Sequence, residues 1–146
     1  MESMVLFIAF ELAVLGVGLP AAAAEREFTQ ADCRMEAGPC VKTTGGLTVA
    51  FDINPKPLKT MRELTFTATV SQQGTPTADA SVTIDLSMPG MFMGKNVIQL
   101  ATRHDGTYEG KGVIIRCPSG KRIWQASVAI EWAGKESVVS FLFEVQ

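Results

Sequence analysis

The sequence has few of the residues on which most enzyme and metal sites depend. Its 146 residues include one histidine, three cysteines and one tyrosine. A single histidine excludes a zinc site built from several histidine ligands. No Ser-His-Asp or Cys-His arrangement, carboxylate pair or glycine-rich phosphate loop stands out, so we do not expect an enzyme.

An excess of positive charge is also absent. The chain has 13 basic and 15 acidic residues, and two of the acidic ones, Glu2 and Glu11, precede residue 25. Residues 25–146 therefore carry 13 of each sign. This balance argues against nucleic acid as a partner, because binding it requires a concentrated basic surface. No run of like charges predicts a polybasic contact with a membrane either.

One long apolar segment is present, near the N-terminus. Residues 4–19 are almost wholly apolar, a proline follows, and the alanines at 21–24 provide an A-x-A cleavage sequence before Glu25. This pattern predicts a secretory signal peptide over residues 1–24 and a periplasmic or extracellular protein. The alternative is a retained membrane anchor, in which Glu11 would be costly.

The segment 25–46 has no sustained periodicity, and we expect it to be an irregular leader. It contains Cys33 and Cys40 with a Gly-Pro pair between them. In an oxidising compartment these two cysteines can close a small disulfide loop. The sequence alone nevertheless allows any of the three pairings among Cys33, Cys40 and Cys117.

From residue 47 onward, apolar residues alternate with polar ones, as in strands that are buried on one face. Seven such segments follow without helical periodicity, at 47–53, 64–70, 82–88, 97–102, 107–115, 124–132 and 139–145. They predict an all-β fold, an immunoglobulin-like antiparallel β-sandwich of about seven strands over residues 47–146. The sequence Asp-Gly-Thr-Tyr at 105–108 resembles the tyrosine corner of such sandwiches, in which a buried hydroxyl bonds to the backbone.

Three methionines surround one tight turn. Met88 and Met91 flank a Pro-Gly pair that is typical of a type II β-turn. If the chain leaves the turn extended, Met91 and Met93 point to one side and Phe92 to the other. Thioethers are soft ligands that suit Cu(I), so Met88, Met91 and Met93 are candidate copper ligands. The alternative is that they fill one end of the core.

Antiparallel strands place successive connections at alternate ends of a sandwich. The methionine turn, the loop after the first strand and the loop around Cys117 therefore share one end, whereas His104 and the cysteine leader lie at the other. On this count Cys33 pairs with Cys40, and Cys117 stays free beside the methionines as a fourth sulfur ligand. A leader folded over the far end would instead place Cys117 against Cys33 or Cys40, and Cys117 as a buried inert thiol is a further alternative.

Three short motifs carry a family resemblance. The Met-Pro-Gly-Met-x-Met turn, Asp-Gly-x-Tyr-x-Gly at 105–110 and Gly-Lys-Arg-Ile-Trp at 120–124 resemble the YtkA-like and FixH-like group of small exported or membrane-anchored β-sandwich domains. The resemblance covers roughly residues 60–146. It implies accessory work around copper, such as delivery to respiratory oxidases or association with metal efflux, with Met88, Met91 and Met93 facing the metal. Unlike many copper-handling relatives, this turn has no histidine.

The sequence therefore predicts an exported Cu(I)-binding accessory protein, acting as a copper chaperone or in efflux or oxidase assembly. Its partners would be the copper ion and a membrane efflux pump or an oxidase-assembly protein. The alternative function is a non-metal immunoglobulin-like module, which binds another protein or serves as a structural subunit through a sheet edge or the Met-Phe-Met tip. Arg116, Lys121 and Arg122 would then suit an acidic partner. Edge pairing allows a dimer, and the oligomeric state stays open.

Overall fold

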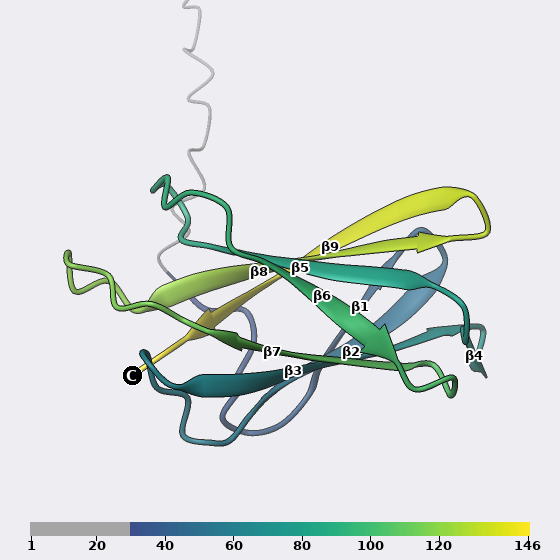
Figure 1. Cartoon of the computed structure of the whole chain (residues 1–146), viewed down its shortest axis with the longest axis horizontal. Helices are drawn as coiled ribbons and strands as arrows, with labels where there is room; N and C mark the ends of the chain where they lie inside the picture. Colours follow the sequence, from purple (N-terminus) through teal and green to yellow (C-terminus); the bar gives the residue numbers. More distant parts are fainter. Residues whose placement is uncertain (1–29) are drawn as a thin grey trace, which may run out of the picture.

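The computed structural model describes residues 30–146, and within them the fold is all-β without helices (Figure 1). The nine antiparallel strands are β1 (Cys40–Thr44), β2 (Leu47–Asn54), β3 (Glu63–Gln72), β4 (Thr75–Pro76), β5 (Ser81–Ser87), β6 (Val97–Thr102), β7 (Thr107–Val113), β8 (Ile123–Trp132) and β9 (Lys135–Glu144). They form a nearly closed, barrel-like sheet in the order β1-β2-β3-β7-β6-β5-β8-β9, and β4 pairs with β3.

The signal peptide predicted over residues 1–24 lies outside the described residues, as do residues 25–29 of the leader. None of the described residues forms a helix that is long and apolar enough to cross a membrane.

Alternating side chains build the core, as the sequence pattern predicts. In β2, Val49, Phe51 and Ile53 are fully buried, while the residues between them are partly exposed. The Phe51 ring lies 5.0 Å from the Phe141 ring and 6.5 Å from the Phe66 ring, measured between centroids, so β2, β3 and β9 meet at one aromatic cluster. Burying one such side chain contributes about 1.5–3 kcal/mol to folding.

Strand β6 joins the two halves of the sheet, because it pairs with β5 along one edge and with β7 along the other. Two glycines of β7 make this possible. A Cβ atom at Gly110 would lie 2.8 Å from the Leu100 side chain, and one at Gly112 would lie 2.4 Å from the Ile98 side chain. Because neither glycine has a Cβ atom, the buried side chains of β6 can pack directly over the β7 backbone.

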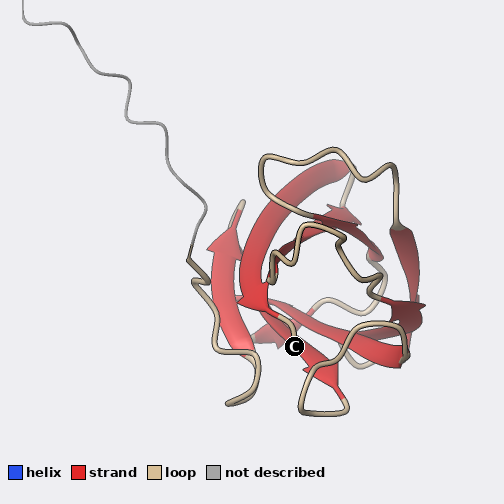
Figure 2. Ribbon diagram, turned by 90° about the vertical axis from the view of Figure 1, so that its left-hand side faces the viewer, coloured by secondary structure: helices blue, strands red, loops and turns tan. Residues whose placement is uncertain are grey.

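Strands β1 and β9 approach each other at the opposite seam and nearly close the ring of strands (Figure 2). Lys42 Nζ donates to the Ser140 carbonyl at 2.6 Å, and Thr44 Oγ1 donates to the Val138 carbonyl at 3.0 Å. A disulfide joins Cys33 to Cys40 at the start of β1, which confirms that predicted pairing and leaves Cys117 free.

Strand β1 occupies residues 40–44, which the sequence analysis assigned to an irregular leader. It forms because Gly45 and Gly46 both have positive φ, +54° and +81°, as a two-residue hairpin turn into β2 requires.

The extra strand reverses the direction of the chain, so the leader lies at the end where β2 finishes. There the Glu36 carboxylate accepts the Leu58 N–H at 2.7 Å. The prediction that the cysteine leader lies at the end opposite the methionine turn was therefore wrong.

Two ends of the fold differ in how their strands are connected. Loops 55–62, 88–96 and 114–122 share one end, here called the methionine end, where Met61 N donates to the Ile114 carbonyl at 2.8 Å. The opposite end, here called the turn end, carries the turns at 45–46, 73–74 and 133–134 and the connections 77–80 and 103–106. The predicted alternation of the connections is thus confirmed from β2 onward, apart from the two-residue strand β4, whose two connections both lie at the turn end.

Candidate metal centre

The methionine turn has the backbone that its sequence predicts. Met91 N donates to the Met88 carbonyl at 3.1 Å, and the two residues form an isolated β-bridge. Gly90 has a φ of +73°, which the third position of a type II turn requires. The Pro-Gly pair therefore holds two thioether side chains on the two arms of one tight turn.

Exposure alternates along the outgoing arm of this turn. Met91 and Met93 are half-buried and pack against the core, while Phe92 between them is 93% exposed. This confirms the predicted alternation. Met88 is itself part of the buried core, which is the packing role that most methionines have.

Cys117 lies on loop 114–122 and faces the methionine turn. Its thiol is free, it is only 5% exposed, and its Sγ atom lies 3.7 Å from the Sδ atom of Met91. Loop 114–122 turns sharply after the cysteine, because Gly120 N donates to the Cys117 carbonyl at 3.1 Å. The structure thus brings Cys117 to Met91, as strand counting predicts. Met88 forms the β-bridge with Met91, and Met93, two residues further along the chain, packs against the core.

Ser119 is the residue at this site to which the sequence analysis gave no role. Its Oγ atom lies 2.9 Å from Cys117 Sγ. Hydrogen bonds from the Ser119 side chain and backbone lower the pKa of the Cys117 thiol, and the positive charge of Lys121 acts in the same direction, against the opposing effect of burial. A hydroxyl two residues after a cysteine, across a Pro-Ser-Gly turn, is the sequence signal that points to this contact.

A surface pocket of about 430 Å³ reaches Cys117 from the side of the chain terminus. It is lined by the basic side chains of Arg116, Lys121 and Arg122, together with Trp124 and Gln146. Cys117 therefore lies between a basic pocket and the thioether of Met91. Its thiol is largely buried, but the residue borders a pocket that opens to solvent.

The only histidine lies elsewhere. His104 is exposed in connection 103–106 at the turn end, where its backbone N–H donates to Thr102 Oγ1 at 3.0 Å. The prediction that His104 does not share an end with the methionines is confirmed. Among residues 30–146, side chains of His, Cys, Asp and Glu form no group of three or more that could hold a metal ion.

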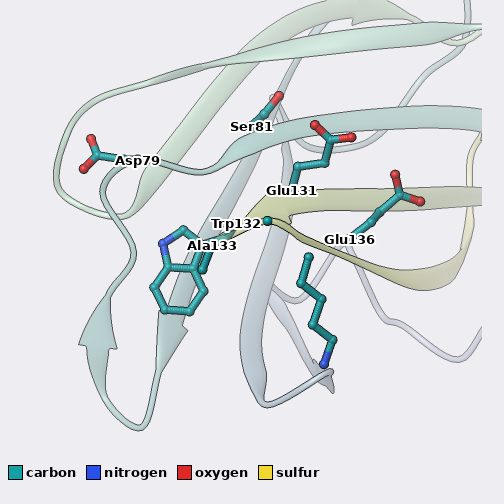
Figure 3. A pocket seen from close by; sticks show the side chains of 8 residues that line it. Asp79, Ser81, Glu131, Trp132, Ala133 and Glu136 are labelled. Atoms are coloured by element: carbon teal, nitrogen blue, oxygen red, sulfur yellow. The ribbon is translucent and has the colours of Figure 1, made fainter.

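A second pocket, of about 470 Å³, lies at the turn end beside Trp132. Figure 3 shows the carboxylates of Asp79, Glu131 and Glu136 around this hollow. Glu131 and Glu136 are direct partners across β8 and β9, an arrangement in which like charges repel. The hollow at the turn end is thus lined by three carboxylates and by Lys135, in contrast to the basic pocket at the methionine end.

Comparison of the chain with models of protein families, with curated proteins and with solved structures found no match in any of the three.

Proposed function

We propose that this chain is an exported Cu(I)-binding accessory protein rather than an enzyme, and that Met91 and Cys117 form the centre of its metal site. The observation that carries the proposal is the 3.7 Å approach of the Cys117 and Met91 sulfur atoms, which come from two loops 26 residues apart. Met88 on the other arm of the turn and Met93 beyond it supply further thioethers.

The donor set fits a soft monovalent ion. A thiolate and thioethers favour Cu(I) over hard cations, which prefer oxygen ligands. Bonds from a transition metal to sulfur are about 2.3 Å long in zinc sites, so two of them span at most about 4.6 Å. Sulfur atoms 3.7 Å apart can therefore bind one ion without separating.

Ser119 prepares the thiol for this role. Metals bind the thiolate, and the hydroxyl of Ser119 can donate to that form at the observed 2.9 Å. A lowered pKa keeps more thiolate at neutral pH, so a metal displaces fewer protons when it binds.

The same proposal includes the fold family, the compartment and the partners. Strands β2-β3-β7 and β6-β5-β8-β9 pair as the two faces of an immunoglobulin-like sandwich would, and this supports the resemblance to YtkA-like and FixH-like domains. Signal-peptide cleavage before Glu25 would release the protein outside the cytoplasm, where a disulfide such as Cys33–Cys40 persists. A membrane efflux pump or an oxidase-assembly protein would receive the copper.

Anaerobic Cu(I) titration against a chromophoric chelator tests the metal site. The protein should bind one Cu(I) per chain, and the M88L/M91L/M93L variant and the C117S variant should each lose this binding. Leucine is close to methionine in volume, so the triple variant keeps the packing of the turn. The matched control is M35L/M61L, which changes one buried and one exposed methionine outside the turn and should bind as the parent does.

Equal Cu(I) affinity in the parent and the triple variant would contradict the proposal. The interaction-module alternative would then explain the exposed Phe92 on the turn.

A further inference from the structure

The three loops of the methionine end carry only positive charge. Loops 55–62, 88–96 and 114–122 contain no aspartate or glutamate, and their basic residues are Lys56, Lys59, Arg62, Lys95, Arg116, Lys121 and Arg122. The sequence has no run of like charge because residues 63–87 and 97–113 separate the three loops, but the fold gathers the loops at one end. Basic residues therefore gather at one end of the fold, although the sequence contains no run of like charges.

Most of these basic side chains form no ion pair with the described residues. Lys56 pairs with Asp52 at 2.6 Å, and Arg122 lies 3.9 Å from Glu144. Arg62 donates to two carbonyls of its own loop, at Pro55 and Pro57. Within residues 30–146, no ion pair engages the remaining four cations, Lys59, Lys95, Arg116 and Lys121.

Exposed apolar side chains gather at the same end. Seven large hydrophobic residues are exposed in the described part of the chain, and five of them lie on these loops or on the strand ends beside them: Met61, Phe92, Val97, Val113 and Ile115. Backbone and side-chain contacts join their segments, because Met61 N bonds to Ile114 and the Asn96 side chain bonds to the Val113 carbonyl. Apolar and basic groups are thus mixed on one surface, here called the docking surface.

We propose that the docking surface binds an anionic lipid membrane, with Phe92 and Met61 inserted among the headgroups and Lys95, Arg116 and Lys121 against the phosphates. Apolar side chains that penetrate the interface, flanked by cations, are the standard chemistry of peripheral binding to anionic bilayers. The three loops themselves carry no carboxylate to repel the headgroups, although Glu36 of the leader lies beside loop 55–62.

The shape of the surface favours a lipid layer over an acidic protein. Phe92 is 93% exposed and Met61 is 65% exposed, and they lie on separate loops outside the basic pocket, so the apolar part of the surface consists of separate exposed side chains. A fluid headgroup layer adapts to such side chains, whereas a folded partner needs a pocket that matches each of them. This inference does not depend on copper, because Phe92 and the lysines are not among the proposed ligands.

Vesicle co-sedimentation of the chain as it is isolated after export tests the proposal. The parent should bind phosphatidylglycerol-containing vesicles and bind phosphatidylcholine vesicles much less. K95Q/R116Q/K121Q should lower the partition coefficient on the order of 100-fold, and F92S about tenfold. R103Q/K135Q and V138S change exposed residues away from this end, and both controls should bind as the parent does.

Circular dichroism and Cu(I) titration keep the outcomes distinct. F92S should retain the parent's fold and Cu(I) affinity, and M88L/M91L/M93L should retain vesicle binding. Equal partition of the parent onto anionic and neutral vesicles, or unchanged partition of K95Q/R116Q/K121Q, overturns the proposal. Failure to bind any vesicle also overturns it. Salt-sensitive binding of an acidic protein would then assign the surface to a protein partner.

Discussion

The two ends of this fold differ in the length of the connections between their strands. At the turn end, three two-residue turns reverse the chain with both central residues at positive φ: Gly45-Gly46, Gln73-Gly74 and Ala133-Gly134. At the methionine end, the three corresponding connections are loops of eight or nine residues. Short turns fix strand register, and long loops are where binding groups are usually carried.

A buried hydroxyl at the turn end holds the chain together. Tyr108 is fully buried, and its hydroxyl donates to the Thr77 carbonyl and accepts the Ala80 N–H. This confirms the structural role predicted for the tyrosine. At the methionine end, by contrast, a buried thiol faces a thioether, and several cations have no carboxylate partner among the described residues. One end is thus built for stability, and the other keeps reactive groups free.

Substituting one glycine at each end tests this contrast most strongly. Gly106 has a φ of +85°, and a Cβ atom there would lie 2.7 Å from Pro76 Cβ, whereas Gly90 has a φ of +73° and nothing within 4 Å. We expect Gly106→Ala to lower the free energy of unfolding by about 3 kcal/mol, from backbone strain and overpacking together. Gly90→Ala should cost only about 1 kcal/mol, from the backbone alone. Urea denaturation of both variants measures the difference, and equal losses would contradict the steric account.

Removing the disulfide should come next in size. The Cys33–Cys40 bridge closes a loop with a sequence separation of 7, for which the chain-entropy model gives about 2.5 kcal/mol. C33S/C40S should lose that much stability by urea denaturation. Hydrogen exchange should show the loss of protection first in β1, where Lys42 and Thr44 bond across the seam to β9. Uniform loss of protection across the sheet would contradict a local role.

The tyrosine corner should contribute slightly less. Tyr108→Phe keeps the ring and removes the hydroxyl, so the Thr77 carbonyl and the Ala80 N–H each lose a partner. The expected loss is about 2 kcal/mol, because two backbone groups that were bonded to the hydroxyl are left without it. Thermal unfolding measures the loss, and Cu(I) binding at the opposite end should be unchanged. A change in Cu(I) affinity would show that the two ends are coupled.

Much of this architecture could be predicted from the sequence, because alternation of apolar and polar residues reports which face of a strand is buried. Leu64, Phe66 and Val82 are examples of residues expected inside and found fully buried. Strand β1 was missed because Val41 is its only large apolar residue, and the strand packs mainly through backbone pairing to β2. The Gly45-Gly46 pair was the available signal.

Only part of the candidate site could be predicted, from strand parity, which is the rule that successive connections lie at alternate ends of the fold. Parity decides the end of the fold at which a connection lies, so it brought Cys117 to the methionine turn and separated it from His104. Parity failed for Cys33 and Cys40, because one uncounted strand reverses the end. It also cannot report which side chains meet, so the contact of Ser119 with Cys117 and the gathering of seven cations required the folded structure.

The smallest change proposed here, Ser119→Ala, leaves stability nearly untouched and tests how the methionine end prepares its thiol. Ser119 is the largest cause of the lowered pKa of Cys117, so its removal should raise that pKa. The thiolate absorbance of the protein should then appear at higher pH than in the parent, and C117S should show no such transition.

Because Cu(I) competes with the proton for the sulfur, the Ser119→Ala variant should bind Cu(I) more weakly than the parent at pH values near or below the thiol pKa. Well above the pKa both proteins carry a thiolate, so the two affinities should converge there. Lys121→Gln removes a weaker cause and should shift the transition in the same direction by less. A difference in Cu(I) affinity that persists at high pH would instead make Ser119 a contributor to the metal site itself, through more than the proton on Cys117.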